Sequence, residues 1–150
     1  MATSPPGPRS FTPSVVRVKS GLAPLAILVV EDDEDLGTYL ADLLADVGHE
    51  PTWVRSAEGA VERLAVAVFD VVLTDVRLDG RMSGLALAQQ LREARRAEVV
   101  IVMTAFGTAE VVETAFASGA VGCLSKPFRT SELLGCIQLG ILRSLREARP

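Results

Sequence analysis

Cysteine is scarce in this sequence: among 150 residues there are two, Cys123 and Cys136. They form neither a Cys-x-x-Cys pair nor the dense framework of a disulfide-bonded scaffold. We therefore expect both to be small, buried, apolar residues of a protein kept in a reducing cytosol.

Long apolar runs and an amino-terminal signal are also missing. The apolar stretches are far shorter than the ~20 residues that cross a bilayer. The opening "MATSPPGPRS" lacks the basic and apolar regions of a secretory signal. These absences give no indication of a membrane location, and we expect a cytoplasmic protein.

An excess of basic residues is absent as well. Lys and Arg number 15 against 19 Asp and Glu, for a formal net charge of −4. Since phosphate backbones attract basic patches, direct binding to nucleic acid is not expected.

Apolar residues, in contrast, make up 49% of the chain, which fits one globular domain with a substantial core. Residues 1–24 hold five of the eight prolines, with scattered Ser and Gly, and are predicted to be a disordered leader. The domain is expected over 25–147, followed by a short tail at 148–150.

Short apolar runs alternate with apolar residues that recur every three or four positions. The repeats predict five helices, the last over about 131–147. Several runs are almost continuously apolar, as in strands covered by helices on both faces. Five strand–helix units predict an α/β fold with an open, doubly wound parallel sheet, whose ligands bind beyond the carboxyl ends of the strands. The predicted strands are 25–30, 51–54, 70–74, 98–103 and 121–125.

Chemically active residues follow four of these strands. Carboxylates crowded at one edge repel one another unless a proton or a cation intervenes. Oxygen ligands that leave room for water and a phosphate suit Mg²⁺. The residues are Glu31 and Asp32 after the first strand, Asp75 after the third, Thr104 after the fourth and Lys126 after the fifth.

Asp75 adds a nucleophile to this predicted metal site, because a carboxylate can attack phosphorus and form an aspartyl phosphate. Lys126 offers a point charge and Thr104 a hydrogen bond to phosphoryl oxygens. No His or Cys stands at a strand end to act as a general base, and His49 is predicted to be a solvated loop residue.

Each of these residues has a simpler explanation when taken alone. The acids could favour a helix amino terminus, Asp75 and Thr104 could cap helices, and Lys126 could be a solvated loop residue. Four strands that each present a suitable group at the same edge favour the functional interpretation. The remaining acids, Asp33, Glu34 and Asp35, are predicted to be solvated residues of a first helical turn, with Asp35 as its cap.

The motifs "ILVVEDDEDL", "VVLTDVRLDGRMSGLAL", "VIVMTAFGT" and "GAVGCLSKPF" resemble those of response-regulator receiver domains of two-component signalling. The resemblance spans residues 25–147. It implies a flavodoxin-like sheet of five parallel strands in the order 2-1-3-4-5, with five helices.

The resemblance also implies residue roles. Asp32 would bind Mg²⁺ directly and Glu31 through water, with Asp75 as phosphoacceptor and the backbone carbonyl of Arg77 as a further metal ligand. Thr104 and Lys126 would clasp the phosphoryl group. The phosphoryl donor would be a sensor histidine kinase or a histidine phosphotransfer protein, and Lys126–Pro127 would be a cis peptide.

Three features depart from the common family pattern. Cys123 stands where an aromatic switch residue is usual, which leaves the usual coupling to Thr104 in doubt. Asp79 replaces a common Pro, in a loop "LDGRMSG" that is one residue longer than the commonest form. Phe106 and Arg77 flank the route of an attacking water, and we expect Phe106 to slow hydrolysis of the acyl phosphate.

No output domain has room after the last predicted helix, so a single-domain regulator that acts on an unidentified protein target is expected. The final helix, with Leu139 and Leu142 assigned to different faces, suggests a homodimer contact. Such a protein is not an enzyme beyond its own phosphorylation and slow autodephosphorylation. Two alternatives are a pseudo-receiver that serves as a phosphorylation-independent interaction domain, and a phosphatase of the haloacid-dehalogenase type, which would need Asp-x-Asp after its first strand.

Overall fold

Five strands alternate with five helices along the chain in a computed structural model, which describes residues 23–96 and 98–147. Nearly all of the predicted leader, and the predicted tail, lie outside the described residues. The predicted strand ends agree with the structure to within one residue. In order, the elements are β1 (Ala26–Val30), α1 (Glu34–Asp46), β2 (Glu50–Val54), α2 (Ala57–Val66), β3 (Val71–Asp75), α3 (Gly84–Glu93), β4 (Val99–Thr104), α4 (Ala109–Ala117), β5 (Gly122–Ser125) and α5 (Thr130–Glu147).

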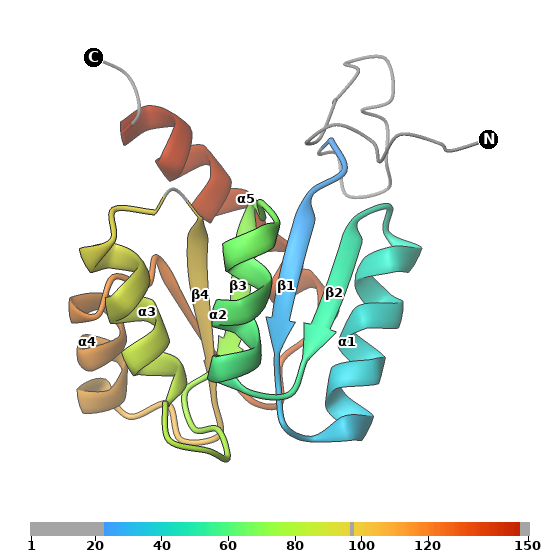
Figure 1. The fold of residues 1–150 in the computed structure, drawn as a ribbon. Coiled ribbons are helices and arrows are strands. Elements are labelled where there is room, and N and C mark those ends of the chain that lie inside the picture. Colours follow the sequence, from blue (N-terminus) through green and yellow to red (C-terminus); the bar gives the residue numbers. More distant parts are fainter. Residues whose placement is uncertain (1–22, 97, 148–150) are drawn as a thin grey trace.

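All strands are parallel and form one sheet in the order β2-β1-β3-β4-β5 (Figure 1). This confirms the predicted flavodoxin-like topology. The carboxyl ends of the strands all point to the lower edge in Figure 1. Every loop that follows a strand therefore meets at that edge.

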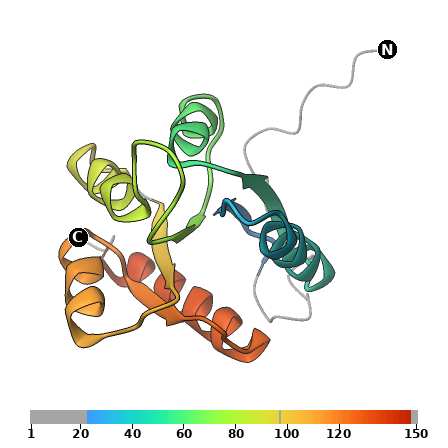
Figure 2. The same ribbon diagram turned by 90° about the horizontal axis from the view of Figure 1, so that it is seen from below.

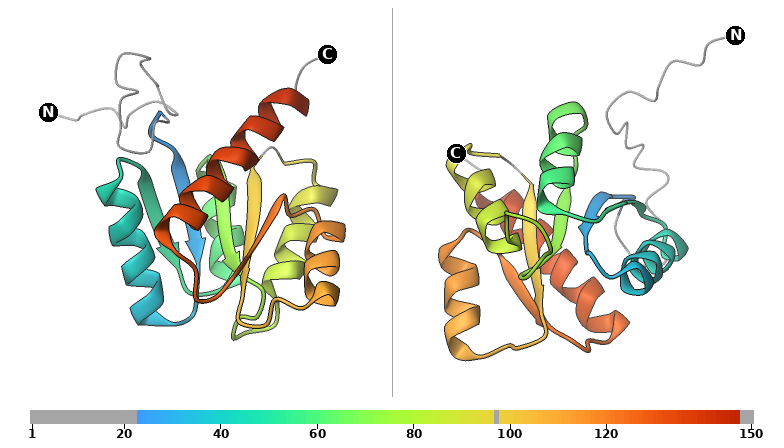
Figure 3. Two further views of the ribbon diagram at one scale, coloured as in Figure 1. Left: turned by 180° about the vertical axis from the view of Figure 1, so that it is seen from behind. Right: turned by 60° about the horizontal axis from the view of Figure 1, so that its bottom comes forward.

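Helices cover both faces of the sheet. Viewed from below, α1 and α5 lie on one face and α2, α3 and α4 on the other (Figure 2), and the rear view shows α5 crossing the sheet diagonally (Figure 3). Alternate residues of the central strands enter the two cores, with Leu28 and Val30 on the α2–α3–α4 side and Ile27 and Val29 on the α1–α5 side. Two-sided burial explains the near-continuous apolar runs.

Four helices begin with a side-chain cap that accepts a hydrogen bond from a backbone N–H in the first turn, which satisfies one of the free donors there. For α1 this cap is Asp33, whose carboxylate accepts from Leu36 N at 3.1 Å. The prediction of Asp35 as the cap was wrong, because Asp35 already lies inside the helix. The other caps are Ser56, Ser83 and Thr108.

His49 is also placed differently from the prediction. Its side chain is buried rather than solvated, with 5% of its surface exposed. The backbone N–H of Leu25 donates to His49 Nδ1 at 3.1 Å. The imidazole thus ties the entry of β2 to the residue before β1, and Nδ1 must be unprotonated to accept this bond.

Two smaller predictions about side-chain environment need correction. Cys123 and Cys136 are half-buried free thiols rather than fully buried residues. Leu139 and Leu142 are both largely exposed and stand three residues apart, so they are neighbours on the outer side of α5 rather than on different faces.

Across the described ranges, none of the helices has the length and apolar character needed to cross a membrane.

We expect His49 to make stability fall with acid. Burial lowers its pKa below the usual 6.5, against an opposing influence of nearby Asp70. The unfolded chain therefore binds the proton more readily, so the contribution of His49 is complete above about pH 6.5 and decreases as the pH falls through that value. His49→Asn keeps an acceptor but does not titrate.

Urea unfolding of both proteins between pH 7.5 and 5 tests this expectation. The wild type should lose more unfolding free energy than His49→Asn over this interval, since the carboxylates are common to both. Parallel pH profiles would show that His49 is not a titrating group of the fold.

Candidate functional site

Three carboxylates converge at the lower edge of the sheet. Glu31 and Asp32 directly follow β1, and Asp75 is the last residue of β3. Strands β1 and β3 are neighbours, with Val30 opposite Thr74. One oxygen from each carboxylate lies within 4.8 Å of the others. The parallel register thus brings together the three acids that the sequence predicted to meet.

Lys126 reaches this cluster from the residue after β5. Its Nζ donates to Glu31 Oε1 at 2.8 Å and to Asp75 Oδ2 at 2.7 Å. The Lys126–Pro127 peptide bond is cis, in agreement with the prediction. One ammonium group therefore links the acids of two different strands.

Glu31 is the most enclosed member of the cluster, with 1% of its side chain exposed. Burial raises the pKa of its carboxyl and the charge of Asp75 adds to this, against the hydrogen bonds from Lys126 and from Asp33 N. Burial lowers the pKa of Lys126, but the combined hydrogen bonds and charges of Asp75 and Glu31 outweigh it, so the pKa is raised. Lys126 therefore stays charged between the two acids.

The donor set fits a divalent cation. With all three carboxylates ionised, one ammonium leaves the cluster negative, and like charges about 4 Å apart repel by roughly 4 kcal/mol at an effective dielectric constant of 20. Asp32 and Asp75 are only partly buried, so water and a phosphate can reach them. Oxygen ligands in an open site are the preference of Mg²⁺.

Backbone amides orient two of the carboxylates. The N–H of Asp79 donates to Asp32 Oδ2 at 2.8 Å, and the N–H of Arg77 donates to Asp75 Oδ1 at 3.3 Å. Both donors belong to the loop between β3 and α3. This loop thus approaches the acidic edge of the sheet through its main chain.

Thr104 ends β4, one position beyond the residue that faces Asp75. Its hydroxyl oxygen accepts from Phe106 N at 3.0 Å and donates to Phe106 O at 3.2 Å. The hydroxyl is thus engaged with the turn after β4 rather than with Asp75. Phe106 itself is 66% exposed.

The sequence model of a protein family described as the response regulator receiver domain matches residues 27–138. The chain belongs to this family. It is 32% identical over 124 residues to the DNA-binding transcriptional regulator NtrC of Escherichia coli K12. The alignment covers 83% of this chain and 26% of NtrC. It is 38% identical over 111 residues to the response regulator protein FleR of Pseudomonas aeruginosa. That alignment covers 74% of this chain and 23% of FleR.

Among solved structures, NtrX from Brucella abortus superposes with a TM-score of 0.76 at 27% identity, covering 83% of this chain and 28% of NtrX. This receiver domain spans only about a quarter of the length of the curated relatives that it matches.

Cys123 occupies the position where the family resemblance predicted an aromatic residue. It lies in β5, opposite Val102, and its half-buried side chain packs against the core on the α2–α3–α4 side. Burial raises the pKa of the thiol, so it is a protonated, apolar side chain rather than a reactive thiolate. The receiver therefore has a small packed group here instead of a mobile ring.

Trp53, the single tryptophan, was not predicted to belong to the site. Its Nε1–H donates to the backbone carbonyl of Glu31 at 2.8 Å. Its ring lies so close to Gly37 of α1 that a Cβ there would meet it at 2.2 Å. The only signal in the sequence was a tryptophan near a strand end, which by itself is as compatible with packing as with support of the acids.

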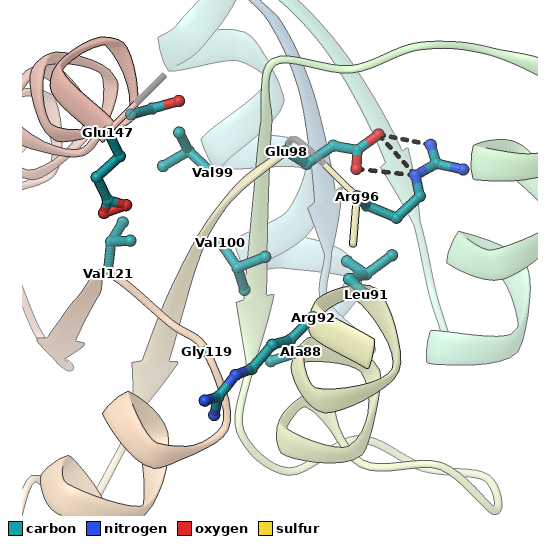
Figure 4. Close-up of a pocket in the computed structure, with 11 residues that line it drawn as sticks. Ala88, Leu91, Arg92, Arg96, Glu98, Val99, Val100, Gly119, Val121 and Glu147 are labelled. Atoms are coloured by element: carbon teal, nitrogen blue, oxygen red, sulfur yellow. Dashed lines mark hydrogen bonds and ion pairs between the residues drawn. The ribbon is translucent and has the colours of Figure 1, made fainter. Parts of the chain in front are cut away.

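A separate cavity of about 370 Å³ lies at the opposite end of the sheet (Figure 4). It is lined by Val99, the first residue of β4, and by Glu147, the last of α5, together with Arg92 and the ion pair between Arg96 and Glu98. Since the acids lie beyond the carboxyl ends of the strands, this cavity does not belong to the acidic site.

Gly84 is required for the shape of the acidic site. A Cβ there would lie 1.8 Å from the Asp75 carbonyl oxygen, which is main chain and cannot move freely. We expect Gly84→Ala to lower the unfolding free energy by at least about 3 kcal/mol. Gly135→Ala in α5, where a Cβ meets nothing within 4 Å, should instead add up to about 1 kcal/mol. Urea unfolding measures both, and equal stability of the two variants would contradict the packing argument.

Proposed function

We propose that this receiver domain accepts a phosphoryl group on Asp75 from the phosphohistidine of a sensor histidine kinase or a histidine phosphotransfer protein, in a Mg²⁺-dependent reaction. The observation that supports this most directly is the convergence of Glu31, Asp32 and Asp75 around the ammonium of Lys126. The phosphorylated form then changes which proteins the domain contacts.

In the transfer, an oxygen of the Asp75 carboxylate attacks phosphorus. A new O–P bond forms as the P–N bond of the phosphohistidine breaks, and the imidazole nitrogen keeps the electron pair and takes a proton from solvent. When bound, Mg²⁺ neutralises charge on the phosphoryl oxygens and on the attacking carboxylate. No general base is needed, because the Asp75 carboxylate attacks in its ionised form.

The remaining groups bind and orient. Asp32, Asp75 and the backbone carbonyl of Arg77 would hold the metal directly, and Glu31 would act through water. Lys126 exchanges its bond to Asp75 for one to a phosphoryl oxygen, and this exchange keeps its positive charge paired. Thr104 turns its hydroxyl from the Phe106 backbone toward the same group.

Signal output requires a route other than ring rotation, because Cys123 is too small to report by burial of a ring. We assign the output to protein contacts on the surface formed by α4, β5 and α5, with no direct nucleic-acid contact by this domain. We further propose a cytoplasmic location, homodimer formation through α5, and no turnover of external substrates beyond self-phosphorylation and slow autodephosphorylation.

Phosphorylation of Asp75 is the central test. Incubation with acetyl phosphate or phosphoramidate and Mg²⁺, followed by intact mass spectrometry, should show one added phosphate on the wild type. The adduct should be absent from Asp75→Ala, because the nucleophile is missing. It should also be absent without Mg²⁺, since the repulsion among the acids is then not relieved.

Other outcomes would favour the alternatives. A folded wild type that takes up no phosphate under these conditions would support a phosphorylation-independent interaction domain. Turnover of an external phosphomonoester would support a phosphatase.

Phe106 is expected to protect the acyl phosphate from water. Its exposed ring stands two residues after Thr104 and is held there by the hydrogen bonds between its main chain and the Thr104 hydroxyl. Phe106→Glu should shorten the phosphoryl half-life roughly tenfold, which corresponds to about 1.4 kcal/mol of barrier. Phosphate release over time measures this. The control is Phe116→Glu, because Phe116 is also an exposed phenylalanine but lies within α4. A half-life for Phe106→Glu as long as that of the wild type would refute the shielding role.

A further inference from the structure

Glu58, in the first turn of α2, holds the loop that connects β3 to α3. Its Oε2 accepts hydrogen bonds from the backbone N–H groups of Arg81 and Met82, each at 3.1 Å. The cap of α2 is Ser56, whose hydroxyl accepts from Gly59 N. The carboxylate of Glu58 is therefore not needed to cap its own helix and is directed to the loop.

The loop closes tightly around this carboxylate. Glu58 Oε1 is buried without a hydrogen-bond partner among the described residues. A Cβ on Gly80 would approach Oε1 to 3.1 Å, and Gly80 has φ of +106°, a conformation that glycine adopts without strain. Burying a hydrogen-bond acceptor without a partner lowers the free energy of unfolding. The two amide bonds at Oε2 compensate for this enclosure. The pKa of the Glu58 carboxyl is lowered, first by its own backbone N–H and then by the amides of Arg81 and Met82, against the opposing effect of burial.

The same loop reaches the acidic site two residues earlier. The N–H of Asp79 donates to Asp32 Oδ2 at 2.8 Å. A proline, which the family resemblance gives as common at this position, has no N–H and could not make this bond. The longer loop and Asp79 thus provide an oriented donor to Asp32, in the same loop whose amides Glu58 binds.

We propose that Glu58 is a positioning residue for the metal site. By fixing the amides of Arg81 and Met82, it holds the Asp79 N–H against Asp32 and orients that carboxylate for Mg²⁺. This inference rests on the proposed function, because it requires that Asp32 binds the cation.

Isothermal titration of MgCl₂ into the unphosphorylated protein tests the inference. Glu58→Ala should raise the Mg²⁺ Kd about tenfold, at the lower end of the effect of losing a group that orients a metal ligand. Glu58→Gln keeps one acceptor oxygen, so its Mg²⁺ Kd should rise less than that of Glu58→Ala. Glu62→Ala is the matched control, since Glu62 is an exposed glutamate one turn further along α2, and its Kd should equal that of the wild type.

Asp79→Pro tests the route of the effect. It removes the donor to Asp32 without touching Glu58, and it should weaken Mg²⁺ binding similarly. If Glu58 acts through this bond, the double variant Glu58→Ala/Asp79→Pro should bind no more weakly than Asp79→Pro alone.

Three results would overturn the proposal. One is a Glu58→Ala protein that binds Mg²⁺ as the wild type does, even if its urea midpoint falls, since the role would then be structural only. Another is full additivity in the double variant. The third applies if Glu58→Ala does not fold: Glu58→Gln and Asp79→Pro would then both bind Mg²⁺ with the Kd of the wild type. A wild type that binds no Mg²⁺ and takes up no phosphate would instead refute the proposed function itself.

Discussion

Repulsion among three carboxylates at one edge of the sheet governs how the site is organised. Glu31, Asp32 and Asp75 lie close enough for one cation to contact all of them. In the protein alone, the Lys126 ammonium partly balances their charge by bridging Glu31 and Asp75. A site built in this way favours any group that adds positive charge, such as a divalent cation.

The supporting structure explains why the acids stay together despite this repulsion. β1 and β3 are covered by helices on both faces, so the strand ends are anchored in two apolar cores. The carbonyl of Glu31 accepts from Trp53, and the close contact between the Asp75 carbonyl and Gly84 leaves no room for a side chain. These groups act on the main chain, and they hold the acids in place while leaving the carboxylate oxygens of Asp32 and Asp75 accessible.

The departures of this receiver domain from the common pattern concern the groups around the acids rather than the acids themselves. Cys123 removes a large side chain from the path between Thr104 and the α4–β5–α5 surface. Asp79 supplies an N–H to Asp32, and Glu58 holds the lengthened loop that carries it. The departures thus lie in two places: Cys123 is in β5, on the side of the core formed by α2, α3 and α4, whereas Asp79 and Glu58 surround Asp32 through the loop between β3 and α3.

Prediction from the amino-acid pattern succeeded for the order of the elements, for the limits of the strands to within one residue, and for the acids, hydroxyl and lysine at the strand ends. It could do so because apolar periodicity reflects burial and because parallel strands place their carboxyl ends at one edge. The surroundings of individual side chains could be learned only from the folded arrangement. His49 is buried, and its ring accepts a hydrogen bond from the residue before β1, 24 positions away in the sequence. The Glu58 carboxylate and the loop it binds are 23 and 24 residues apart in the sequence, and no local pattern in the chain encodes such a contact. Side-chain periodicity reports which face of an element is covered, whereas hydrogen bonds between distant segments depend on the packed arrangement of the whole sheet.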